Sequence, residues 1–142
     1  MLKLECHHIG IATKNLEREI LYYETLNYKI EGEIFEDPIQ KVRGVFMVNN
    51  GMRIELLQSI SESSPLLNYL KKGIQMYHQG FVVEQINDMI KQLIRDGAIL
   101  VSPPQKAVAF NGRRIAFLYM QNRMLIELIE KPSGNKSRTK IE

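Results

Sequence analysis

The sequence predicts an α+β fold built from two copies of one strand-helix-strand-strand-strand module. HHIGIAT (residues 7–13) has a counterpart seventy positions later in YHQGFVV (residues 77–83). RIELLQ (residues 53–58) has a similar counterpart in LIELIE (residues 125–130). Both pairs are short apolar runs of strand length, and similarity at a fixed offset is typical of a duplicated structural unit.

Each copy of the first strand is followed by a segment with helical periodicity. Asn15 is suited to cap the first helix, because its short side chain can accept a backbone N–H. Adding 70 to the apolar positions of this helix finds the same spacing again: Leu16, Ile20 and Tyr23, then Ile86, Ile90 and Leu93. The helices are predicted to end at Asn27 and Gly97, residue types that favour a left-handed C-terminal stop.

The remaining elements complete two modules and a connection. Strands are predicted in the first copy at 28–36, 42–48 and 52–58, and in the second at 98–102, 113–120 and 123–130. A linker helix is predicted at 63–73, with Ser64 as its cap. We therefore expect one domain over residues 1–131, with module one at about 4–60 and module two at about 75–131.

Two further segments have distinct predicted roles. Residues 103–112 (PPQKAVAFNG) form the longest irregular stretch expected, of the kind that often becomes a lid or a substrate wall. Residues 132–142 are polar and basic, which predicts a disordered tail. In residues 131–142, four basic side chains oppose Glu142, so removing them leaves 19 − 4 = 15 basic and 16 − 1 = 15 acidic residues.

This charge balance and the overall composition exclude several classes of protein. A neutral body argues against a nucleic-acid partner despite the net charge of +3. No apolar run is long enough for a membrane span or a signal peptide, which predicts a cytoplasmic protein without a membrane partner. Cys6 is the single cysteine, so an intramolecular disulfide is excluded, and we expect it to be a small buried residue.

A histidine and a glutamate recur in each copy. His8 and Glu55 are 47 residues apart, and His78 and Glu127 are 49 apart. Singly, a strand glutamate usually faces water and a lone histidine usually fills space beside a hydrogen-bond partner. Four such residues in register across a repeat predict a metal-ligand set, because carboxylates among aliphatic neighbours need a compensating cation. Histidine and glutamate ligands suit cobalt, nickel, zinc, manganese or iron.

These motifs resemble the vicinal oxygen chelate superfamily, which includes glyoxalases, bleomycin resistance proteins, methylmalonyl-CoA epimerases and extradiol dioxygenases. HHIGIA, SPLLNYLKKG, RRIAFLY and LIELIE are most similar to the epimerase branch and its glyoxalase-related relatives. The resemblance spans residues 4–131. It implies the glyoxalase fold, in which two βαβββ modules form a cup of curved sheet, and one divalent ion bound by His8, Glu55, His78 and Glu127.

The resemblance also implies a reaction, namely removal of a proton next to a carbonyl of a chelated substrate. We expect an isomerase most like methylmalonyl-CoA epimerase, acting on a thioester. The alternatives are a lyase like lactoylglutathione lyase, acting on a hemithioacetal, and a metal-free small-molecule binding protein of the same fold. An iron dioxygenase is disfavoured by the fourth protein ligand. A homodimer or an exchange of modules between two chains is compatible with the family.

The identity of the base departs from the epimerase pattern. Epimerases of this family carry a separate glutamate on the third strand of the first module, whereas residues 41–48 contain no acid. We therefore expect a metal-bound carboxylate, Glu127 or Glu55, to be catalytic, and Glu127 is preferred because it lies beside the 103–112 loop. Four cationic side chains are candidates for binding an anionic substrate: Arg43, Lys106, Arg113 and Arg114.

Overall fold

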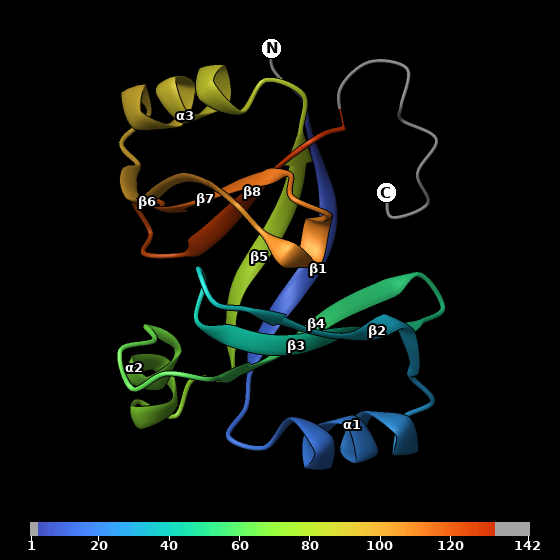
Figure 1. The fold of residues 1–142 in the computed structure, drawn as a ribbon. Coiled ribbons are helices and arrows are strands. Elements are labelled where there is room, and N and C mark those ends of the chain that lie inside the picture. Colours follow the sequence, from blue (N-terminus) through green and yellow to red (C-terminus); the bar gives the residue numbers. More distant parts are fainter. Residues whose placement is uncertain (1–2, 133–142) are drawn as a thin grey trace. The chain divides into compact units, whose positions relative to one another are not determined.

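The computed structural model describes residues 3–132 of the 142-residue chain. It confirms the α+β class and the two βαβββ modules (Figure 1). The elements are β1 (Leu4–Ala12), α1 (Leu16–Thr25), β2 (Lys29–Asp37), β3 (Val42–Asn49), β4 (Met52–Ser59), α2 (Leu66–Lys71), β5 (Met76–Val83), α3 (Ile86–Arg95), β6 (Ile99–Lys106), a 3-10 turn (Val108–Phe110), β7 (Arg114–Tyr119) and β8 (Leu125–Glu130).

The strands belong to one mixed sheet with the order β2-β3-β4-β1-β5-β8-β7-β6. In each module the first strand is parallel to the last strand. Neighbouring strands among the last three are antiparallel. The chain divides into two compact units, His8–Tyr77 (the N-terminal unit) and residues 3–7 with 78–132 (the C-terminal unit). Strands β1 and β5 continue without a break through this division, at His7–His8 and Tyr77–His78.

In the N-terminal unit, α1 packs on one face of its strands. Asn15 caps this helix by accepting the backbone N–H of Arg18 at 3.0 Å, as predicted. Asn27 and Gly97, which follow α1 and α3, both have positive φ. The apolar face of α1 joins the inward residues of β1, β3 and β4 in one core: Ile11, Leu16, Ile20, Val45, Met47, Ile54 and Leu56.

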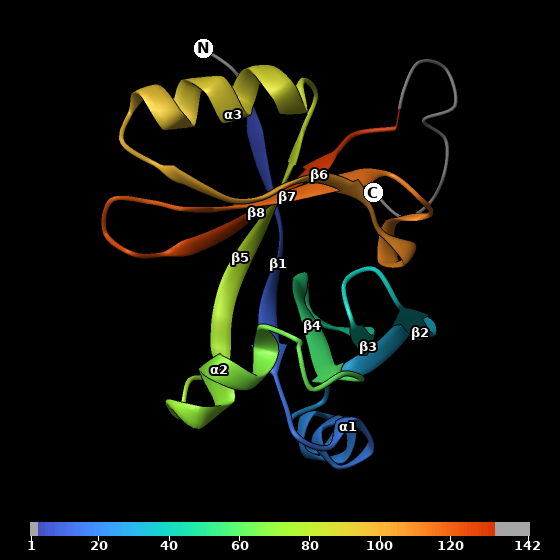
Figure 2. The same cartoon turned by 60° about the vertical axis from the view of Figure 1, so that its left-hand side comes forward.

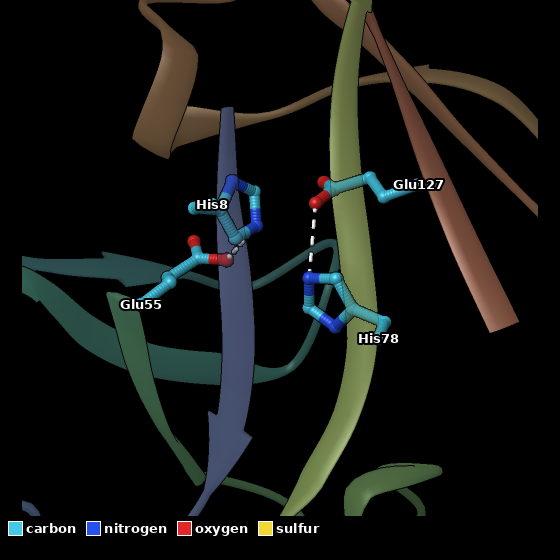
Figure 3. A group of neighbouring side chains, drawn as sticks. All are labelled: His8, Glu55, His78 and Glu127. Atoms are coloured by element: carbon cyan, nitrogen blue, oxygen red, sulfur yellow. Dashed lines mark ion pairs between the residues drawn. The ribbon is translucent and has the colours of Figure 1, made fainter. Parts of the chain in front are cut away.

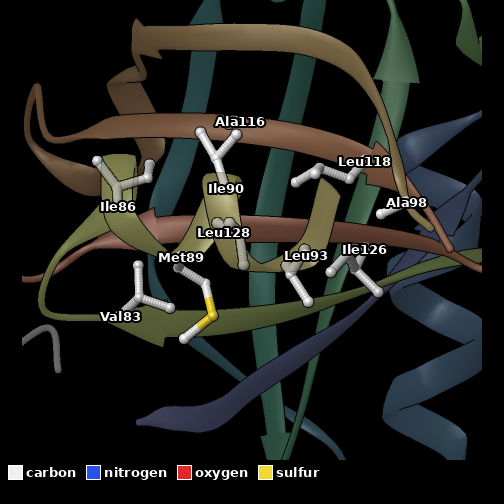
Figure 4. Close-up of a cluster of buried hydrophobic side chains, with 10 residues drawn as sticks. All are labelled: Val83, Ile86, Met89, Ile90, Leu93, Ala98, Ala116, Leu118, Ile126 and Leu128. Atoms are coloured by element: carbon white, nitrogen blue, oxygen red, sulfur yellow. The ribbon is translucent and has the colours of Figure 1, made fainter. Parts of the chain in front are cut away.

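In the C-terminal unit, α3 covers the corresponding face of β5, β7 and β8 (Figures 2 and 4). Its buried side chains recur at i, i+3, i+4 and i+7, which places them on one stripe of the helix. They pack against the strand residues to form a second core: Val83, Ile86, Met89, Ile90, Leu93, Ala98, Ala116, Leu118, Ile126 and Leu128. The strand residues that alternate with this core, among them His78 on β5 and Glu127 on β8, point to the opposite face.

The 103–112 segment was predicted wrongly as a loop over its whole length. Strand β6 continues to Lys106, and the 3-10 turn occupies Val108–Phe110. Two consecutive prolines are tolerated because β6 is an edge strand, where a missing N–H costs no ladder hydrogen bond. The pairing of β6 with β7 is irregular between Leu100 and Gln105, as expected around prolines.

Two smaller differences concern the linker helix and Cys6. The linker helix is shorter than predicted, and Ser64 lies two residues before it, accepting the N–H of Leu66 at 3.3 Å. Cys6 is exposed, because it lies on the terminal part of β1 away from either core. The predicted tail falls almost wholly on residues 133–142, which lie outside the described residues. None of the described helices is long and apolar enough to cross a membrane.

Candidate metal centre

The first His-Glu pair lies in the N-terminal unit. His8 is on β1 and Glu55 is on β4, and the Nε2 atom of His8 lies 3.0 Å from Oε1 of Glu55. Both residues are 4% exposed. Within β1, His8, Gly10 and Ala12 share one face, and the adjacent Ile11 points to the core. Because side chains alternate between the two faces of a strand, the polar pair lies on the face opposite the apolar cluster that packs against α1.

The second pair repeats this arrangement in the C-terminal unit. The Nε2 atom of His78 on β5 lies 3.1 Å from Oε1 of Glu127 on β8. His78 is 5% exposed and Glu127 is 2% exposed. Figure 3 shows each imidazole turned toward the carboxylate of its own pair. Both predicted pairs are therefore formed, each from the first and last strands of its module.

The four side chains together have the donor chemistry of a divalent-metal site. They supply two imidazole nitrogens and two carboxylates, all from buried residues. Two neutral imidazoles and two carboxylates would leave a dication formally neutral, which offsets the cost of burying the two acids. Borderline metals such as zinc, cobalt and nickel accept this mixture of nitrogen and oxygen ligands. The residues present therefore fit a divalent ion.

Two of the arginines proposed for substrate binding make ion pairs within their own units. Arg43 donates to both carboxylate oxygens of Glu17, at 3.1 and 2.7 Å, and to Gln58. Arg114 donates to both carboxylate oxygens of Glu130, at 3.0 and 2.7 Å. Hydrogen bonding to Arg114 lowers the pKa of the Glu130 carboxyl below its ordinary value. The charges of both guanidinium groups are thus largely compensated.

The other two predicted cations have different surroundings. Lys106 is exposed at the end of β6. Arg113 is partly buried, and its Nε donates to the carbonyl of Phe110 at 3.3 Å while its guanidinium carbon lies 5.8 Å from the Phe110 ring centre. Lys106 therefore keeps the more accessible charge, and Arg113 is fixed against the 3-10 turn.

Sequence reasoning missed two aromatic residues beside the pairs. The ring of Phe46 on β3 lies 5.6 Å from that of His8, and the ring of Phe117 on β7 lies 5.4 Å from that of His78. A signal was present in the repeat, because 117 − 46 = 71 falls between the offsets of 70 and 72 shown by the pairs. In the register of β3 with β4, the residue across from Glu55 is Phe46.

Comparisons with known proteins agree with this geometry. The family model of the glyoxalase/bleomycin resistance protein/dioxygenase superfamily matches residues 7–117. The mitochondrial methylmalonyl-CoA epimerase of Dictyostelium discoideum is 30% identical over 133 residues, covering 88% of this chain and 77% of the relative. The match therefore extends through most of both chains.

Solved structures give the same result for the fold. A hypothetical protein from Bacillus halodurans superposes with a TM-score of 0.81 at 27% identity, covering 93% of this chain and 97% of the other. A variant of Streptomyces coelicolor methylmalonyl-CoA epimerase in complex with 2-nitronate-propionyl-CoA gives a TM-score of 0.79 at 22% identity. It covers 94% of this chain and 100% of the other, and at that identity it supports the fold alone.

Proposed function

Because the chain belongs to the glyoxalase/bleomycin resistance protein/dioxygenase superfamily, we propose that it is a divalent-metal-dependent isomerase that epimerises a 2-methyl thioester. The observation that carries this proposal is the repeated, buried His-Glu pair, His8 with Glu55 and His78 with Glu127. The similarity to methylmalonyl-CoA epimerases supports the choice of reaction. All four side chains are proposed to hold one ion.

The charges of the four side chains support a shared ion, because one dication would balance the two buried carboxylates. A metal-free binding protein would lack this dication, and burying two carboxylates without a compensating charge is costly.

The proposed reaction requires a weakly acidic C–H bond to be broken and re-formed. A divalent ion bound to the four ligands would draw electron density from the oxygens of a chelated substrate, which makes the neighbouring C–H more acidic. A carboxylate of the protein then takes the α-proton while the electron pair of the C–H bond moves onto the carbonyl. Return of a proton to the opposite side of the carbon gives the other epimer.

Glu127 is proposed as the carboxylate that takes this proton. The reason drawn from the 103–112 loop is weakened, because residues 103–106 of that segment belong to strand β6. The surroundings of the two pairs supply a better one. Phe46 beside the first pair is 8% exposed and buried, whereas Phe117 beside the second pair is only partly buried. We infer that a substrate approaches the second pair from the side of Phe117, since Glu127 itself is only 2% exposed.

The substrate is proposed to be a thioester of coenzyme A with a second carbonyl group near the reacting carbon. Such a compound offers two oxygens for chelation, which suits an octahedral ion that already has four protein ligands. Among the predicted cations, exposed Lys106 is the best candidate for an anionic part of the substrate, because Arg43 and Arg114 are already paired. This assignment rests on charge and exposure.

Hydrogen exchange in deuterated buffer tests the proposal. Protein loaded with cobalt or nickel is mixed with one epimer of methylmalonyl-CoA, and deuterium at the α-carbon is followed by NMR. We expect exchange and conversion to the other epimer, and loss of both after the ion is removed by a chelator. A hemithioacetal is the parallel substrate, and exchange with it alone would favour the lyase. No exchange with either substrate would overturn the proposal and favour the binding protein.

A further inference from the structure

An aromatic residue from the middle strand lies against the histidine of each pair. In the N-terminal unit, the planes of Phe46 and His8 meet at 73° with their ring centres 5.6 Å apart. In the C-terminal unit, Phe117 and His78 meet at 86° and 5.4 Å. Both arrangements are edge-to-face, the geometry that aromatic pairs prefer.

The strand register shows that this repetition is built into the fold. Phe46 is the cross-strand neighbour of Glu55, and Phe117 is the cross-strand neighbour of Glu127. On the other side of each glutamate the neighbour is a glycine. It is Gly10 for Glu55 and Gly80 for Glu127. Each unit therefore carries a row of glycine, glutamate and phenylalanine across three strands.

This row gives each of its members a distinct spatial role. Side chains directly opposite one another on a sheet are close enough to touch. The glycine adds no side chain beside the carboxylate, which leaves that side to the imidazole arriving from the histidine two residues earlier on the same face. The phenylalanine occupies the opposite side, where its ring contacts the same imidazole.

We propose that Phe46 and Phe117 are positioning residues, which hold the rings of His8 and His78 in the orientation that directs Nε2 toward the glutamate and the proposed ion. The inference rests on the proposed metal centre. An imidazole on a strand has a broad torsion about its Cβ–Cγ bond, so its orientation is set by what contacts it. Residues that orient a ligating histidine normally strengthen metal binding.

The consequence is measurable as metal affinity. Loss of an edge-to-face contact that orients a ligand should change the metal-binding constant by roughly two- to tenfold. Replacing phenylalanine by leucine removes the flat contact while keeping an apolar side chain of similar size. Replacing it by tyrosine keeps the ring, and partly exposed Phe117 has room for the added hydroxyl.

Cobalt titration of Phe117→Leu, Phe117→Tyr and Phe46→Leu tests the inference, with the visible absorption of bound cobalt as a second readout. The matched control is Phe81→Leu, because Phe81 lies on β5 of the same unit but packs against the apolar cluster under α3. We expect roughly two- to tenfold weaker binding and an altered spectrum in Phe46→Leu and Phe117→Leu. Phe117→Tyr and Phe81→Leu should match the native protein in both readouts.

The outcomes separate this inference from the proposed function. Native cobalt affinity and native spectra in Phe46→Leu and Phe117→Leu would overturn the positioning role and leave the metal centre intact. Weaker binding in Phe81→Leu to the same extent would also overturn it, since a general loss of packing would then explain the effect. Native protein that binds no cobalt would overturn both proposals. Thermal unfolding of each variant confirms that the measurement is made on folded protein.

Discussion

The Nε2 atom of His8 lies 3.0 Å from Oε1 of Glu55, although 55 − 8 = 47 residues separate them in the chain. Parallel pairing of β1 with β4 brings them together, because Gly10 is in register with Glu55 and His8 lies two residues earlier on the same face. The same relation between β5 and β8 brings His78 to Glu127. A small shift in either register would separate an imidazole from its carboxylate.

Replacing Glu127 by glutamine is expected to separate metal binding from proton transfer. The amide oxygen can still coordinate a metal, so binding should be weakened but kept. An amide is too weak a base to take the α-proton, so exchange should fall by roughly 100-fold or more. The measurement is deuterium incorporation into methylmalonyl-CoA by metal-loaded protein.

The control for this variant is Glu130→Gln on the same strand, whose carboxylate pairs with Arg114 at the partly exposed end of β8. It should exchange at the native rate. Native exchange in Glu127→Gln would exclude Glu127 as the base and leave Glu55 as the remaining ligand carboxylate.

The ion pair between Arg114 and Glu130 is expected to make stability depend on acid. Hydrogen bonding lowers the pKa of Glu130 in the folded protein below 4.5, so the pair stabilises above that pH and its contribution disappears as the pH falls through the folded pKa. The groups are 38% and 29% exposed, which limits the effect to less than about 1 kcal/mol. Urea unfolding of native protein and Glu130→Gln at pH 7 and pH 3 measures it. The difference between them should be smaller at pH 3 than at pH 7, and a constant difference would contradict this.

Replacing Gln85 by asparagine is expected to stabilise the protein. Asn15 caps α1 through its side chain, whereas Gln85, at the N-cap of α3, makes no such hydrogen bond. The backbone angles of Gln85 (φ −122°, ψ 84°) lie close to those of Asn15 (φ −147°, ψ 99°), so a shorter side chain should reach the first turn of α3. The gain should be about 1 kcal/mol, measured by thermal unfolding. Gln85→Ala is the control and should give no gain in stability. A Gln85→Asn variant with the native melting temperature would show that the cap is not formed.

Much of this arrangement was predictable because the repeat provides two independent readings of each element. The Asn15 cap and both His-Glu pairs follow from local spacing combined with an offset of 70 to 72 residues. The extension of β6 through Pro103 and Pro104 was not predictable, since edge position is a property of the whole sheet. Phe46 and Phe117 were missed because apolar strand residues look alike until cross-strand register is known.

Removing residues 132–142 is expected to leave folding and metal binding intact. The segment is polar and basic, and it has no apolar periodicity by which it could dock. Thermal unfolding and cobalt titration of the shortened protein test this. A fall of several degrees in Tm would show that the segment packs against the rest of the chain.

The central claim is that both pairs hold one ion, and the number of ions bound per chain tests it most directly. Metal analysis and cobalt titration of native protein, His8→Ala and His78→Ala address this together. We predict one ion per chain in native protein, and a loss of affinity of roughly 100-fold or more in each variant, because either histidine is a direct ligand. Two ions per chain, or one ion held at native affinity after either histidine is removed, would contradict the account.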